Sequence, residues 1–269
     1  GLEKVRIRIS FATSASGACR MKDADYVKSY FQSPGTVAEW WNPTEGDFAH
    51  VYYRQMQQVK QWIEQCQPRT CLEVSCGKGR VTSQLEQLCF QYVGSDISSE
   101  MISLARARCT RATFIQGDAE QLAHPEESFD AVVCLEALVH YPNPGNALKE
   151  FHRVLKKDGV LIIDSDNRYS LRRLIKRVYL MMTGVAEFGA DIFRPYSKQE
   201  FTTSICRAGL QIEAFTYFGV ASPIRISAKE RTMYIISPVV SRYLDNFKLD
   251  ALPLLQQLAT YHLVKARKK

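Results

Sequence analysis

An apolar run breaks into a glycine-rich turn at Cys71-Leu-Glu-Val-Ser-Cys-Gly-Lys-Gly79, and a helix pattern follows the turn. The next apolar run, 91–97, carries an acidic residue, Asp96, near its end. Glycine lets the backbone turn tightly and approach a ligand without a Cβ in the way. A carboxylate about 20 residues beyond such a turn can accept hydrogen bonds from both hydroxyls of a ribose. The combination predicts a nucleoside pocket at the edge of a parallel sheet.

Strand-like and helix-like segments alternate from residue 70 onward. We expect strands at 70–75, 91–96, 112–116, 129–135, 159–164, 210–218 and 259–266. Helices are expected at 79–89, 99–109 and 145–156, and from Ser197, which opens a capping box, to about Ala208. This alternation predicts an α/β fold: a Rossmann-like, doubly wound sheet of seven mostly parallel strands with helical lid insertions.

The domain organisation follows from where this rhythm begins and breaks. We expect an added extension at 1–20 and a single domain over 21–269, whose N-terminal helical cap (21–66) covers the pocket mouth. Two insertions, 166–196 and 219–257, interrupt the later strands, and the second contains a helix pattern near 233–247. Insertions of this kind commonly shape the part of a pocket that selects the substrate.

Composition excludes several classes of protein. No apolar run reaches the roughly 18 residues of a membrane span, and the N-terminus shows no signal-peptide pattern. Eight scattered cysteines, some within expected strands, indicate reduced thiols and a cytoplasmic location. The net charge is +7, but four positive charges fall in the last five residues, a pattern typical of a solvated end. We therefore expect no nucleic-acid partner.

The chain resembles the class I S-adenosylmethionine-dependent methyltransferases over residues 50–217 and the final strand. Five ordered motifs carry the resemblance: Leu72-Glu-Val-Ser-Cys-Gly-Lys-Gly-Arg80, Val93-Gly-Ser-Asp-Ile97, Gln116-Gly-Asp-Ala119, Phe129-Asp-Ala-Val-Val-Cys-Leu135 and Leu155-Lys-Lys-Asp-Gly-Val-Leu161. One departure is Ser75, where many members carry glycine. The resemblance implies S-adenosyl-L-methionine as the cofactor, bound across the carboxyl ends of the strands.

For the methionine end of the cofactor, the resemblance implies four contacts. Glu73 would meet the amino group of the methionine moiety, and Gly77 with the neighbouring backbone, including Ser75, would line the same moiety. Leu135 would lie beside the methionine backbone.

For the nucleoside end, the resemblance assigns Asp96 to the ribose and Ile97 to packing on the adenine. Asp118 would accept a hydrogen bond from the adenine N6 amine, and Ala119 would donate its backbone N–H to the ring. Structural roles remain open as alternatives: the glycines would serve a tight turn alone, and Asp118 would cap a helix.

Dinucleotide oxidoreductases also place an acidic residue after a glycine-rich turn. Their fingerprint, Gly-x-Gly-x-x-Gly, directs helix amides at a pyrophosphate. The third glycine would fall at Thr82 in this chain, and Glu73 would repel phosphate while suiting an ammonium group. The methyltransferase interpretation is therefore favoured.

A narrower resemblance links Val37-Ala-Glu-Trp-Trp-Asn-Pro43, followed by Arg54, to quinone-biosynthesis O-methyltransferases. It implies that Arg54 binds the cofactor carboxylate, although the tryptophan pair equally fits a lid packed on the sheet. Some of these enzymes hold a divalent cation through Glu-x-x-Glu-His. The corresponding residues here are Glu136, Val139 and His140, and the missing second carboxylate argues against a metal.

Two residues after the fourth strand are candidates for catalysis. His140 is the best general base by position and by its ordinary pKa, and Tyr141 is a weaker candidate. The alternative for His140 is a structural one, in which the ring braces a loop.

The segment 170–182 predicts an amphipathic helix with Leu171, Leu174, Ile175, Val178, Met181 and Met182 on one face, and Arg172, Arg173, Lys176 and Arg177 on the other. We expect a lid whose apolar face covers the active site and whose charges meet water. The alternative is a peripheral contact with an anionic membrane surface. Numerous aromatic residues in the insertions suggest a fairly apolar acceptor.

Together these observations predict methyl transfer to oxygen or carbon of a small, fairly hydrophobic metabolite. One alternative acceptor is a polyprenyl quinone precursor at a membrane surface. An alternative of another class is a non-catalytic, methyltransferase-like protein that binds the cofactor.

Overall fold

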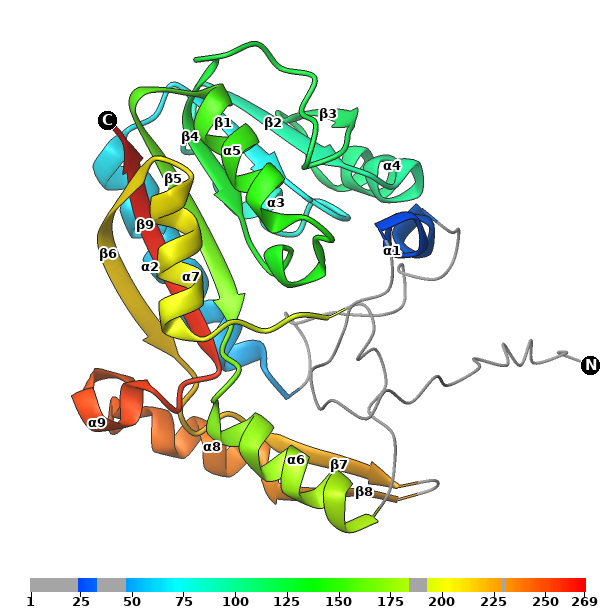
Figure 1. Ribbon diagram of the computed structural model, residues 1–269, viewed down its shortest axis with the longest axis vertical. Helices are drawn as coiled ribbons and strands as arrows, with labels where there is room; N and C mark the ends of the chain where they lie inside the picture. Colours follow the sequence, from blue (N-terminus) through cyan, green and yellow to red (C-terminus); the bar gives the residue numbers. More distant parts are fainter. Residues whose placement is uncertain (1–23, 33–46, 184–192, 229–230) are drawn as a thin grey trace, which may run out of the picture.

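The computed structural model describes residues 24–32, 47–183, 193–228 and 231–269, and its centre is a seven-stranded sheet (Figure 1). The strands are β1 (Thr70–Val74), β2 (Gln91–Asp96), β3 (Thr113–Gln116), β4 (Phe129–Cys134), β5 (Leu155–Asp166), β6 (Leu210–Phe218) and β9 (Tyr261–Lys268). Their order is β3-β2-β1-β4-β5-β9-β6, and β9 runs antiparallel to both of its neighbours. The predicted Rossmann-like, mostly parallel sheet is confirmed.

Helices cover both faces of this sheet. They are α2 (Ala49–Cys66), α3 (Thr82–Leu85), α4 (Ser99–Arg108), α5 (Pro144–Val154) and α7 (Lys198–Arg207). A further helix, α1 (Ala24–Gln32), lies near the segment that follows β3, where its Lys28 contacts Asp118. Adjacent residues of β1 point to opposite faces, because the side-chain period of a strand is two. Cys71 packs with α2 and α3, whereas Leu72 packs with α5 and α7, and both side chains are fully buried. Burial on both faces explains the continuous apolar runs of the sequence.

Some element boundaries differ from those predicted. The expected helix 79–89 is reduced to α3, and β5 begins at Leu155, where a longer helix was expected to continue. The capping box at Ser197 is confirmed: its side chain accepts the Glu200 amide, and the Glu200 carboxylate accepts the Ser197 amide.

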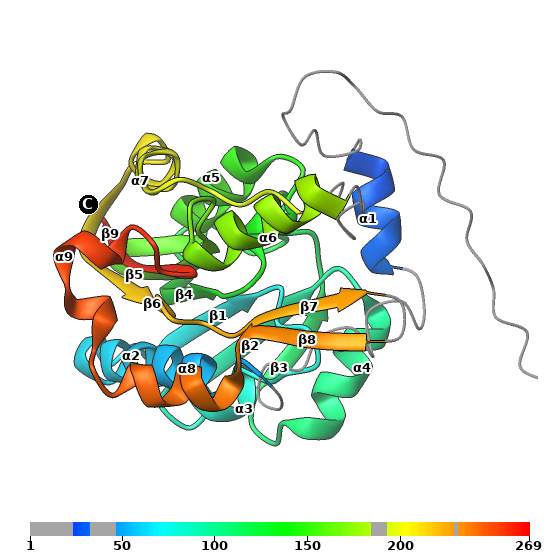
Figure 2. The same ribbon diagram turned by 90° about the horizontal axis from the view of Figure 1, so that it is seen from below.

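The two insertions form a separate layer beyond the carboxyl ends of the parallel strands. They supply α6 (Leu171–Thr183), the hairpin β7 (Ile224–Ala228) and β8 (Arg231–Ile236), α8 (Pro238–Asp245), a 3₁₀ turn η2 (Leu249–Ala251) and α9 (Pro253–Gln256). Figure 2 shows α6, the hairpin and α8 side by side in this layer. The helix expected near 233–247 is wrong in its first part, because β8 pairs with β7 and Pro238, capped by Ser237, starts α8 only afterwards.

Two sequence predictions fall outside the described residues: the extension at 1–20 and the tryptophan pair within 37–43. Among the helices that are described, none combines the length and the apolar character needed to cross a bilayer.

Candidate functional site

A cavity of about 630 Å³ lies at the carboxyl ends of β1, β2 and β4, a volume typical of small-molecule sites. Its lining includes eight of the nine residues predicted to bind the cofactor and both predicted catalytic residues. These are Glu73, Ser75, Gly77, Asp96, Ile97, Asp118, Ala119, Leu135, His140 and Tyr141. Residues spread over about seventy positions of the sequence are thus brought together, because parallel strands end at one edge of the sheet.

Glu73 provides a buried carboxyl group in the cavity wall. Its Oε2 accepts hydrogen bonds from Thr82 Oγ1 at 2.7 Å and from Tyr92 Oη at 2.9 Å. Burial raises the pKa of Glu73 to about 7, despite these two bonds to the charged form. The group therefore ionises near neutrality and is suited to an ammonium partner.

Asp96 closes the glycine turn from the neighbouring strand. Its Oδ2 accepts the Gly77 amide at 2.8 Å, and its Oδ1 accepts the Ser98 amide at 2.9 Å. Gly77 has a φ of 51°, and a Cβ at this position would meet no atom within 4 Å, so the turn borders open space. Each carboxylate oxygen has a further lone pair for a ligand hydroxyl. The turn and the carboxylate together fit a nucleoside that lies directly against the backbone.

Two residues with strained backbones flank this turn. Ser75 and Glu136 have φ values of 57° and 58°, a region that disfavours side chains bearing a Cβ. Ser75 occupies the position where many class I methyltransferases carry glycine, and its Oγ lies 2.8 Å from Tyr141 Oη. Tyr141 also contacts Cys134 Sγ at 3.4 Å, and burial raises the pKa of Tyr141 well above its usual value. Tyr141 therefore links β1 to β4 as a protonated phenol, a geometry that favours bracing over proton transfer.

The nucleoside end of the cavity involves a residue that the sequence did not reveal. Lys28 of α1 places its Nζ 2.6 Å from Asp118 Oδ2, and Asp118 Oδ1 accepts the Glu120 amide. The hydrogen bond to Asp118 raises the pKa of Lys28. The helical pattern predicted α1, but no motif linked it to a residue 90 positions away.

His140 lies between two aromatic rings at the cavity wall. Its ring centroid is 5.1 Å from that of Phe31 and 5.4 Å from that of Phe193. This position is compatible with both predicted roles, since the ring borders the cavity and is also held by its neighbours.

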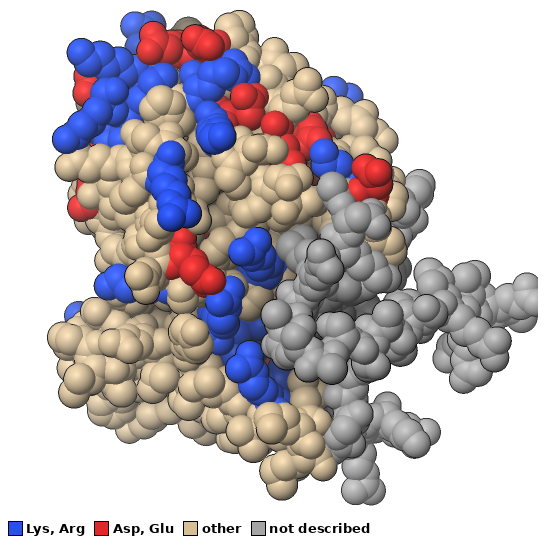
Figure 3. All heavy atoms as spheres, viewed as in Figure 1, with Lys and Arg blue, Asp and Glu red and all other residues tan. Residues whose placement is uncertain are grey.

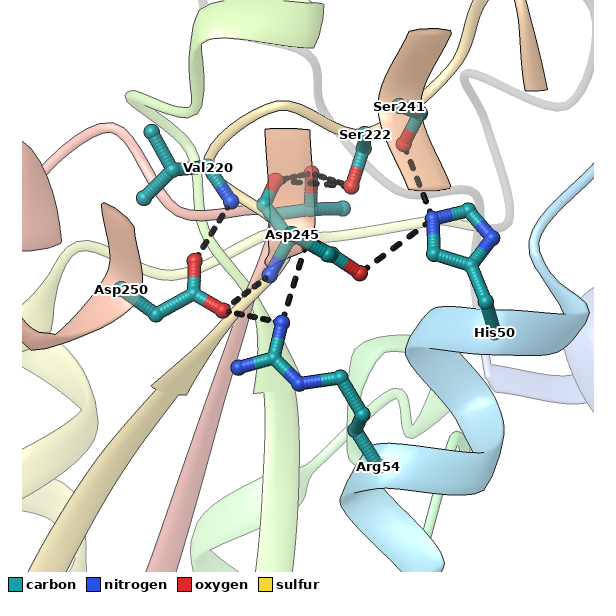
Figure 4. A network of polar contacts seen from close by, with 9 residues as sticks. His50, Arg54, Val220, Ser222, Ser241, Asp245 and Asp250 are labelled. Carbon is teal, nitrogen blue, oxygen red and sulfur yellow. Dashed lines mark hydrogen bonds and ion pairs between the residues drawn. The ribbon is translucent and has the colours of Figure 1, made fainter. Parts of the chain in front are cut away.

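Arg54 is absent from the cavity lining and belongs to a polar network between α2 and the second insertion (Figure 4). Its Nη1 lies 3.0 Å from Asp245 Oδ1 and 2.9 Å from Asp250 Oδ2. Asp250 also accepts the amides of Gly219 and Val220. This placement corrects the prediction that Arg54 binds the cofactor: its charge is directed to two carboxylates almost 200 residues away in sequence, which no local motif indicates.

Arg80 is a cation of the cavity that the sequence analysis did not single out. Its Nη2 lies 2.6 Å from Glu136 Oε2, and its guanidinium stacks 4.5 Å from the centroid of Tyr52. The Glu136 carboxylate, the first residue of the partial metal-binding pattern, is therefore engaged in an ion pair. The available signal was position, since Arg80 directly follows the glycine turn.

The orientation of α6 is the reverse of the one expected for a lid. Its basic residues line the cavity: Arg172, Arg173, Lys176 and Arg177. Val178, Met181 and Met182 of its apolar face are 56%, 79% and 82% exposed. Two of the guanidinium groups lie over aromatic rings, Arg172 over Phe48 and Arg173 over Phe193 of the cavity lining, and these contacts favour this orientation.

The aromatic residues of the insertions are also placed differently from our expectation. Within the first insertion, Phe193 borders the cavity but Tyr169 is exposed, and Tyr217 and Phe218, which precede the second insertion at the end of β6, pack into the core. The abundance of aromatic residues therefore says less about the acceptor than the sequence suggested.

Comparison with known proteins relates the first part of the sheet to methyltransferases, in agreement with the sequence motifs. Residues 72–163 match the family model described as a methyltransferase domain. The ubiquinone biosynthesis O-methyltransferase of Alkalilimnicola ehrlichii is 29% identical over 140 residues, covering 49% of this chain and 56% of that protein. The chain spans little more than half the length of the curated relatives it matches.

Solved structures share the fold at low sequence identity. Magnesium protoporphyrin IX methyltransferase from Synechocystis PCC 6803, solved with SAH bound, aligns with a TM-score of 0.60 at 16% identity over 92% of this chain and 100% of that chain. The cyclase SpnF aligns with a TM-score of 0.57 at 18% identity over 85% of both chains. A fold shared by a methyltransferase and a cyclase does not by itself give the reaction.

Proposed function

We propose that the protein transfers the methyl group of S-adenosylmethionine to oxygen or carbon of a small organic acceptor, a proposal supported by the match of residues 72–163 to the methyltransferase-domain model. The observation that carries the proposal is the convergence of eight predicted cofactor residues on one cavity. In this proposal the carboxyl groups of Glu73, Asp96 and Asp118, which all line the cavity, bind the ammonium group, the ribose and the adenine amine of the cofactor.

The cofactor supplies an activated methyl group when it is bound, and the protein's own residues hold and orient the reactants. Arg80 replaces Arg54 as our candidate for the cofactor carboxylate, because its guanidinium borders the cavity near Glu73. His140 is the candidate acceptor of a proton when the methylated atom carries one.

Calorimetric titration with S-adenosylhomocysteine tests the proposal. We expect saturable binding in the micromolar range at neutral pH. Absence of binding to correctly folded protein would refute both the methyltransferase proposal and its alternative, a non-catalytic protein that binds the same cofactor. Methyl transfer from labelled S-adenosylmethionine in an acceptor screen then separates these two functions.

A second candidate acceptor is a polyprenyl quinone precursor at a lipid surface. It is favoured by exposed apolar side chains that gather on the insertion layer: Val178, Met181 and Met182 of α6, Val239, Val240 and Tyr243 of α8, then Phe247, Leu252 and Leu254. In Figure 3 the lower left and the lowest part of the surface are tan, whereas a run of blue Lys and Arg side chains lies in the middle of the lower half.

Flotation with neutral and anionic liposomes tests this candidate. We expect association through apolar contact, so the triple variant Val178→Ser, Met181→Ser, Met182→Ser should lose it. A protein that stays in the aqueous fraction with both kinds of liposome would rule out a lipid surface as the source of the acceptor.

A further inference from the structure

The two ends of the cavity carry different sets of charges. The end formed by the strands carries the carboxyl groups of Glu73, Asp96 and Asp118, and cations also line it: Lys28, which pairs with Asp118, Lys78, and Arg80, which pairs with Glu136. The end formed by α6 carries four cationic side chains, Arg172, Arg173, Lys176 and Arg177. These four are spaced at i, i+1, i+4 and i+5, so they share one face of the helix over more than a turn. We refer to them as the basic face of α6.

Aromatic contacts hold part of the basic face in place, and one of the two rings, that of Phe193, borders the cavity. The guanidinium of Arg172 lies 4.7 Å from the centroid of Phe48, and that of Arg173 lies 4.5 Å from the centroid of Phe193. Arg173 Nη2 is 3.9 Å from Asp166 Oδ1, a long contact that offsets part of the charge. Stacking on a ring leaves the in-plane donors of a guanidinium available for an anion.

The basic face is unusual for a helix that covers an active site. A helix whose charges meet water would place them outward and its apolar residues inward. In α6 three of the four cationic residues are half-buried against the cavity, while Met181 and Met182 are exposed. Bringing like charges together beside a partly enclosed space costs free energy, and a bound anion offsets that cost.

We propose that the methyl acceptor is an anion whose carboxylate or phosphate group binds to the basic face of α6. This inference rests on the proposed function and specifies its substrate class. The acceptor's organic part then lies between the basic face and the cofactor, beside His140, Phe193 and Tyr261, all of which border the cavity. An anion held at this end directs the opposite end of the acceptor toward the cofactor methyl.

Small aromatic probes that differ in charge test whether binding requires an anionic group. Benzoate, phenyl phosphate and benzyl alcohol are titrated by ligand-observed NMR against the full chain saturated with S-adenosylhomocysteine, over the roughly millimolar range expected for fragments. We expect both anions to bind and the neutral alcohol to bind at least tenfold more weakly. Whichever anion binds more tightly identifies the group, carboxylate or phosphate. Equal binding of all three probes would overturn the proposal.

Variants of the basic face of α6 test whether the anions bind there. The double variant Arg172→Gln, Lys176→Gln should weaken anion binding at least tenfold, while Lys157→Gln, on an exposed residue at the start of β5, should leave it unchanged. The single variant Lys176→Gln repeats the test if the double variant unfolds. Unchanged anion binding in a folded variant would overturn the proposal.

The affinity for S-adenosylhomocysteine distinguishes this inference from the proposed function. We expect the double variant to bind this ligand as the unmodified protein does. A parallel loss of both affinities would mean that the basic face holds the cofactor carboxylate, and would overturn the anionic acceptor. If the unmodified protein binds anions through the basic face but not S-adenosylhomocysteine, the methyltransferase proposal fails and the anion site stands.

Discussion

The two ends of the cavity hold their charges by different means. At the strand end, Asp96 accepts two backbone amides, so its position follows from the path of the main chain. At the α6 end, Arg172 and Arg173 are oriented by aromatic rings that come from other parts of the chain. A site built on backbone geometry is reproduced wherever the motif occurs, whereas a site built on side-chain packing depends on how an inserted helix is turned.

Removal of the Asp96 carboxylate should produce the largest effect at the strand end. Each hydrogen bond to a charged group contributes roughly 1.5–3 kcal/mol, so Asp96→Ala should weaken the binding of S-adenosylhomocysteine by about 100-fold or more. Calorimetry measures the affinity. Asp130 lies near the amino end of β4, whereas the cavity lies at the carboxyl ends of the strands. Asp130→Asn is therefore the matched control and should leave the affinity for S-adenosylhomocysteine unchanged. Equal affinity in Asp96→Ala would show that the ribose assignment is incorrect.

Substitution of His140 tests its proposed role as the acceptor of a proton. If the ring accepts a proton, His140→Ala should lower turnover by roughly 100-fold with any substrate that the protein methylates, with cofactor affinity unchanged. His152→Ala, which removes a histidine of α5 that does not line the cavity, is the control. A fall in both cofactor affinity and melting temperature would instead indicate that His140 braces the loop.

The pKa of Glu73, raised by burial to about 7, should make cofactor affinity depend on pH. The ionised carboxylate attracts the ammonium group, so affinity should fall by up to about tenfold per pH unit below 7. In the cofactor-free protein the sign is opposite: the folded state keeps the proton longer, so stability decreases as pH rises from about 4.5 to 7. Titrations from pH 5.5 to 7.5 should be flat for Glu73→Gln; a slope retained in this variant would assign the effect to another group.

Substitution of Arg54 should have the smallest effect on cofactor binding. It tests the polar network that joins α2 to the second insertion. Arg54→Gln leaves Asp245 and Asp250 without their shared cation, and we expect a loss of roughly 1–2 kcal/mol in the free energy of unfolding, since the pair is partly exposed. Cofactor affinity should not change. Urea unfolding and calorimetry measure the two quantities, and Arg54→Lys should recover part of the stability. A selective loss of cofactor affinity would restore the original assignment of Arg54.

The residues that could be predicted from sequence are those that the main chain positions. Glu73 and Asp96 lie at the carboxyl ends of β1 and β2, Gly77 lies in the turn after β1, and all three line the cavity. The partners of Arg54 and Asp118 could not be predicted, because Asp245 and Lys28 reach them only through the packing of distant helices. The amphipathic pattern of α6 predicted a helix but carried no information on which face turns inward.

The dependence on packing partners also explains why the hairpin of β7 and β8 was not predicted from the sequence. Residues 231–236 are compatible with a helix pattern by periodicity alone, and they become a strand because β7 offers a pairing edge. Local propensity is a weak guide where a partner strand decides the outcome.

The ion pair between Lys28 and Asp118 has a consequence for the rate of cofactor exchange. An adenine amine that binds Asp118 competes with a cation already bound there, so the Lys28 side chain must move away before the amine can bind. Salt weakens partly exposed ion pairs. Raising the ionic strength should therefore speed cofactor association, the opposite of the usual slowing of encounters between opposite charges, and Lys28→Met should abolish this acceleration in stopped-flow measurements.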